Sequence, residues 1–153
     1  MIQKPRALFF IAVIVAATAL VCVQAQSTDY KKLVTAADIQ TVTGMKDVAL
    51  LSSSPANDSL LGALMFSRRD GALVAVVNFA KPGTFVMDKA HTVAGVGDEA
   101  FESADHSSLC FRKGNRPVII ASGVGSSPKS GGLKPILMPE HLRALARIIY
   151  SRM

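Results

Sequence analysis

The stretch "HTVAGVGDEAFES", residues 91–103, gathers several side chains that could do chemistry. It contains His91 and the adjacent carboxylates Asp98 and Glu99, and His106 follows shortly after it. Carboxylates and imidazoles bind divalent cations, and together they also serve as acid and base in hydrolysis. The ligand-binding candidates are therefore Asp98, Glu99 and His106.

The spacing of these groups gives little support to a metal site or a catalytic site. His91, His106 and His141 are far apart in the sequence, and neither HExxH nor CxxC occurs. Side chains 98 and 99 of a strand would point to opposite faces and could not chelate one ion together. No Gly-x-Ser-x-Gly motif presents a nucleophilic serine. A metal-binding protein or hydrolase that uses the acidic patch around Asp98 and His106 is therefore the alternative hypothesis.

The same stretch has a structural interpretation, which the sequence favours. Gly95 and Gly97 allow the backbone to turn sharply, and Asp98 is expected to cap that turn with its side chain. Glu99 is then a solvated carboxylate, and Phe101 enters the core. A phosphate would be repelled by the two carboxylates, and no helix is expected to begin directly after the glycines.

Two helices are predicted near the two ends of the chain. "LVTAADIQTVTG" predicts a short helix with Thr35 as N-cap, Asp38 completing a capping box and Gly44 ending it. "PEHLRALARIIYSRM" predicts the longer helix, with Pro139 in its first turn. Its apolar residues follow the i, i+3, i+4, i+7 spacing of one buried face. They are Leu142, Leu145, Ala146 and Ile149.

Strands are predicted between these helices. Residues 60–80 read as a β-hairpin that turns at Asp70-Gly71, and the apolar run from Ala72 to Ala80 is its central strand. Further strands are expected at "SLCFR" and at Val118–Ala121, joined by the turn "KGN". The expected fold is α+β, a mostly antiparallel sheet with an N-terminal and a C-terminal helix packed on one face.

Three segments are predicted to lie outside this sheet. "LSSSPANDS" and "GVGSSPKSGGLKP" have loop compositions, rich in serine, glycine and proline. "TFVMDKAH", residues 84–91, is ambiguous between a short helix and an extended crossing, and the helix is favoured. All three would connect elements of the sheet rather than belong to it.

The first 25 residues predict an export signal. Lys4 and Arg6 precede an apolar run, and "VQA" ends at Ala25 with residues that suit signal peptidase. Residues 26–153 would then form a single α+β domain, periplasmic or extracellular. An uncleaved segment would instead be an N-terminal membrane anchor. Cys22 follows Val21, where lipoprotein processing requires a small residue.

The charge and the aromatic content of the chain indicate which classes of binding partner to expect. Without Lys4 and Arg6, 15 basic residues stand against 11 acidic ones, which favours contact with an anionic membrane surface or an envelope protein. Nucleic acid is not an expected partner, because the basic residues are scattered and the chain has no tryptophan for stacking. No cofactor is predicted. Cys110, alone outside the signal, is expected to be a small buried hydrophobe in a strand.

Four segments resemble a group of small exported bacterial envelope proteins and lipoproteins from domain families of unknown function. These segments are "TAADIQTVTG", "VAGVGDEAF", "LCFRKGN" and "LRALARIIYSR". The resemblance implies location and fold rather than activity, and the missing lipidation site departs from the lipoprotein members. The function expected is that of an exported, non-enzymatic envelope module that binds a partner protein or a small ligand.

Overall fold

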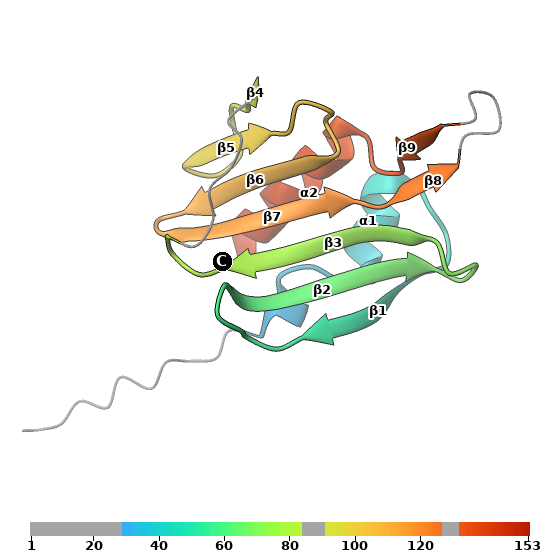
Figure 1. The fold of residues 1–153 in the computed structure, drawn as a ribbon, viewed down its shortest axis with the longest axis horizontal. Coiled ribbons are helices and arrows are strands. Elements are labelled where there is room, and N and C mark those ends of the chain that lie inside the picture. Colours follow the sequence, from blue (N-terminus) through green and yellow to red (C-terminus); the bar gives the residue numbers. More distant parts are fainter. Residues whose placement is uncertain (1–28, 84–90, 127–131) are drawn as a thin grey trace, which may run out of the picture.

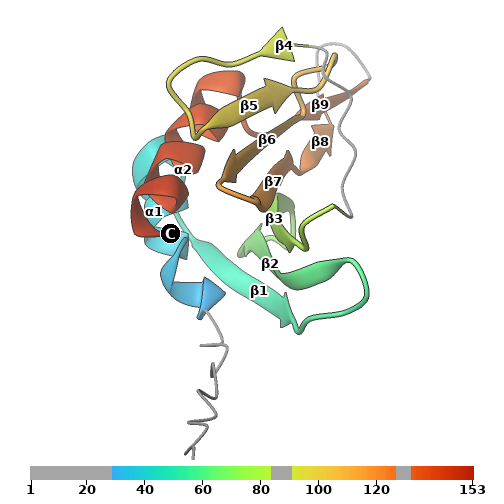
Figure 2. The ribbon, with the colours of Figure 1, turned by 90° about the vertical axis from the view of Figure 1, so that its left-hand side faces the viewer.

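The computed structural model describes residues 29–83, 91–126 and 132–153 (Figure 1). Seven antiparallel strands form one sheet in the order β1-β2-β3-β7-β6-β5-β4. Figure 2 shows helices α1 (Ala36–Thr43) and α2 (Pro139–Arg152) together on one face of this sheet. The predicted α+β class, with its antiparallel sheet and its helix near each end, is confirmed. The strands are β1 (Val48–Ser54), β2 (Leu60–Arg68), β3 (Leu73–Ala80), β4 (His91–Thr92), β5 (Glu99–Glu102), β6 (Ser108–Lys113) and β7 (Arg116–Ser122).

The main core lies between the helices and the sheet. The predicted apolar face of α2 is fully buried there, together with Ile39 of α1. It packs against alternate residues of the central strands, as expected of a sheet with one covered face. Those strand residues include Leu64, Phe66, Val77, Phe79, Leu109, Phe111, Val118 and Ile120.

The predicted signals at the ends of α1 are confirmed. The Asp38 carboxylate accepts a hydrogen bond of 2.8 Å from the Thr35 amide, and the Thr35 hydroxyl accepts one of 3.3 Å from the Asp38 amide. Gly44 ends the helix with a φ of 70°, a conformation that glycine adopts without strain. The Arg152 guanidinium also binds Asp38, so α1 and the last turn of α2 are joined.

The hairpin of β2 and β3 forms as predicted, but two predicted loops contain strands. Residues 48–54 form the edge strand β1, and Val124–Ser126 (β8) pairs with Leu133–Pro135 (β9) in a separate two-stranded sheet. Pairing with a neighbouring strand overrides the loop composition of these serine- and glycine-rich segments. The 3-10 turn η1 (Tyr30–Lys32) precedes α1.

Two other sequence predictions fall mostly beyond the described ranges. Residues 84–90 of the favoured short helix lie outside them, and His91 belongs to strand β4. The predicted signal segment, residues 1–25, also lies outside them. Within the described ranges, the helices are too short or too polar to cross a bilayer.

Candidate functional site between strand β5 and helix α2

The turn that leads into β5 depends on its two glycines, as predicted. Gly95 and Gly97 have φ values of 72° and 63°. The Asp98 amide donates to the Arg112 carbonyl at 3.0 Å, which holds the turn against β6. A Cβ atom on Gly97 would lie 2.8 Å from that same carbonyl oxygen. Gly97 is therefore required both by its backbone conformation and by the close approach of β6.

Asp98 does not cap its own turn, which corrects the sequence prediction. Its Oδ2 accepts a hydrogen bond of 2.6 Å from the amide of Gly114, in the β6–β7 turn. Its Oδ1 accepts one of 2.9 Å from the hydroxyl of Tyr150 on α2. These bonds lower the pKa of Asp98, and the bond from the Gly114 amide has the largest effect. Asp98 therefore joins three segments that are distant in the sequence.

Glu99 is not a simple solvated carboxylate, which corrects the second expectation for this stretch. It lies opposite Arg112 in the ladder of β5 and β6, and its Oε2 is 2.7 Å from the Arg112 Nε. Both side chains are substantially exposed, so this cross-strand ion pair contributes at most about 1 kcal/mol. Asp98 and Glu99 thus contact different partners and do not form a shared chelate.

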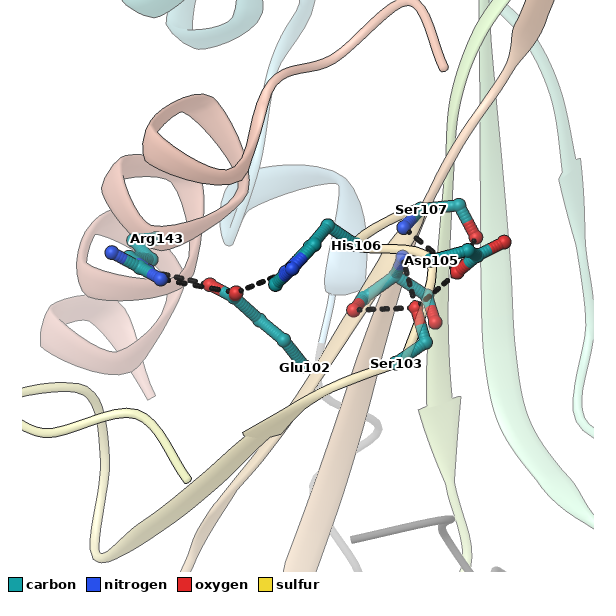
Figure 3. Close-up of polar contacts among 7 residues, drawn as sticks. Glu102, Ser103, Asp105, His106, Ser107 and Arg143 are labelled. Carbon is teal, nitrogen blue, oxygen red and sulfur yellow. Dashed lines mark hydrogen bonds and ion pairs between the residues drawn. The ribbon is translucent and has the colours of Figure 1, made fainter. Parts of the chain in front are cut away.

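Glu102 belongs to the acidic patch of the sequence but is not among the ligand-binding candidates Asp98, Glu99 and His106. It is the most buried carboxylate described. Its side chain has no exposed area, and both of its oxygens bind the Arg143 guanidinium of α2 (Figure 3). The distances are 2.5 Å from Nε to Oε1 and 3.0 Å from Nη2 to Oε2. The bonds to Arg143 outweigh the effect of burial and lower the pKa of Glu102.

The alternation of β5 explains why Glu102 is buried. Ala100 and Glu102 share the face of the strand that packs toward α2, and Phe101 lies on the other face. Phe101 is half-buried there, which corrects the prediction that it enters the core. In "EAFES" the two apolar residues, Ala100 and Phe101, are adjacent rather than alternating, so the sequence carries no signal for a buried glutamate.

His106 completes the contacts of Glu102. Its Nδ1 lies 3.0 Å from Glu102 Oε2, and its side chain is 47% exposed. The backbone at His106 has a φ of 55°, which is uncommon for a residue other than glycine. The imidazole stacks on that of His91, with 4.9 Å between centroids and 11° between planes. Figure 3 shows His106 and Arg143 approaching Glu102 from different elements.

The serines of the β5–β6 loop hold the loop itself together. The hydroxyls of Ser103 and Ser107 donate to Asp105 Oδ1 at 2.7 and 2.8 Å, and the Ser107 amide donates to the same oxygen. These bonds lower the pKa of Asp105 to about 2, and the bond from the Ser103 hydroxyl has the largest effect. The hydroxyls of Ser103 and Ser107, in the same loop as His106, thus act as donors to Asp105.

The arrangement of the histidines does not suit a metal ion. An imidazole binds a metal in the plane of its ring, and two nearly parallel stacked planes do not converge on one cation. Among the described residues, no group of three histidine, cysteine or acidic side chains is placed to hold a metal. The third histidine, His141, instead accepts a hydrogen bond of 3.3 Å from the Met138 amide at the start of α2.

The contact between His106 and Glu102 matters for the arrangement of this region. Glu102 holds the Nδ1 side of the His106 ring, as a carboxylate does in many catalytic sites, and part of the ring is accessible to water. The same contact, visible in Figure 3, connects the β5–β6 loop to α2 through Glu102.

A polar stripe on α2 carries the remaining contacts to this region. It consists of Arg143, Arg147 and Tyr150, at i, i+4 and i+7 spacing, and each residue contacts the strand side of the site. Arg147 donates to the Gly95 carbonyl at 3.3 Å. The Tyr150 ring also lies under the Lys113 ammonium, 4.9 Å from the centroid. Residues 91–106 and the α2 polar stripe therefore hold α2 on the sheet.

Cys110 lies in strand β6, as predicted, and is buried. Its side chain is on the face opposite to α2, with Ala80 and Ile119. Burial raises the pKa of the Cys110 thiol to about 11, and the charge of Glu99 acts in the same direction. A thiol that remains protonated at neutral pH is a poor nucleophile.

Comparisons of this chain with protein-family models, with curated proteins and with solved structures find no match. The resemblance to exported envelope proteins therefore stays a prediction based on the four short motifs.

Proposed function

We propose that this chain is an exported, non-enzymatic module of the cell envelope that binds a partner protein or a small ligand. The proposal rests on the observation that the acidic and serine side chains of residues 91–106 have hydrogen-bond or ion-pair partners within the protein. Asp98, Glu99 and Glu102 each bind groups of the protein itself, and the serines of the adjacent loop bind Asp105. A stretch whose reactive groups are engaged in this way supports a structural role better than a catalytic one.

Two features of the sequence support the location in this proposal. Residues 1–25 have the basic start, apolar run and small residues of a cleavable signal. The remaining residues have a moderate excess of positive charge, which favours an anionic membrane surface or an acidic partner protein.

Intact-mass measurement tests the export step. Protein isolated from its native cells is expected to begin at Gln26 and to be recovered with the envelope or in the medium. A chain that still begins at Met1 would support an uncleaved membrane anchor. A lipid on Cys22 would contradict the interpretation of the signal.

Affinity capture tests the binding step. The tagged protein is incubated with native envelope extract, and both proteins and small molecules are identified by mass spectrometry. Heat-unfolded protein serves as the control for non-specific capture by exposed apolar surface. One envelope protein or ligand, enriched only on the folded protein, is the expected result. Enrichment of a divalent metal alone would favour the alternative, a metal-binding protein.

A further inference from the structure

We draw no further inference here: the strongest candidate, the exposed and uncharged edge of strand β1 (Val48–Ser54), carries none because nothing in the part of the chain that the structure describes shows what covers it.

Discussion

Glu99 and Glu102 lie in the same four-residue strand, yet their carboxylates have different surroundings. Glu99 pairs with Arg112 at the exposed surface, while Glu102 is enclosed between the sheet and α2 with Arg143 as its partner. Removing a buried acceptor leaves its donors without a partner, whereas an exposed pair can be replaced by water. The two glutamates should therefore respond differently to the same substitution.

We expect Glu102→Gln to lower the free energy of unfolding by about 1–3 kcal/mol at neutral pH. The Arg143 side chain is 42% exposed and can be rehydrated in part, which keeps the loss below that of a wholly buried pair. Glu99→Gln is the matched control and should cost less than about 1 kcal/mol. Urea denaturation measures both, and equal losses would contradict the distinction.

The pH dependence of stability gives Glu102 a second signature. Its pKa is lower in the folded protein than its ordinary value of 4.5, mainly because Arg143 binds the charged form. The contribution of the Glu102 carboxylate to the free energy of unfolding is therefore fully present above pH 4.5. It is lost as the pH falls through the pKa that Glu102 has in the folded protein. The wild type should lose more stability than Glu102→Gln between neutral pH and pH 3. Asp38 and Asp105 are present in both proteins, so their lowered pKa values do not affect this comparison.

The two glycines of the turn before β5 share a conformation but differ in their surroundings. Gly97→Ala should destabilise by about 2 kcal/mol or more, because a positive φ and a contact with the Arg112 carbonyl both oppose the added methyl group. Gly95→Ala should cost only about 1 kcal/mol, since nothing lies within 4 Å of the added atom. Equal losses in denaturant melts would show that the close approach of β6 contributes nothing.

At the scale of elements, the sequence predicted those whose signals are local. The Thr35 capping box, the Asp70-Gly71 turn and the apolar face of α2 each depend on residues within a few positions of one another. Strand β1 was missed because the segment "LSSSPANDS" has the composition of a loop. Residues 51–54, the first part of that segment, are extended because strand β1 pairs with β2. The contacts of Asp98 were missed for a similar reason, since Gly114 and Tyr150 adjoin it only after folding.

The capping box of α1 gives a prediction at this scale. Thr35→Ala should destabilise by about 1 kcal/mol, because the Asp38 amide and carboxylate each lose a bond to the Thr35 hydroxyl. Thr41→Ala makes the same chemical change within the helix, where the hydroxyl only bonds the Ala37 carbonyl. It should be neutral or slightly stabilising, since alanine favours helix. Thermal unfolding monitored by circular dichroism compares them.

Across the whole molecule, Gly95, Asp98 and Glu102 each contact α2. Arg143, Arg147 and Tyr150 contact a buried glutamate, a turn carbonyl and Asp98, while the apolar face of the same helix covers the sheet. The sequence indicated the fold class and the turn, because both follow from local patterns. It could not indicate Glu102 or the stacking of His91 on His106, since both depend on how β4, the β5–β6 loop and α2 meet.

The central claim is that residues 91–106 stabilise the fold rather than bind a metal. Thermal melts of the wild type, Asp98→Ala and Glu102→Gln, each with and without Ca²⁺, Mn²⁺ or Zn²⁺, test it most directly. We expect both variants to melt below the wild type in every condition, and no metal to raise the wild-type melting temperature. A metal that raises the wild-type melting temperature but not that of Asp98→Ala would contradict the claim and identify this stretch as a metal site.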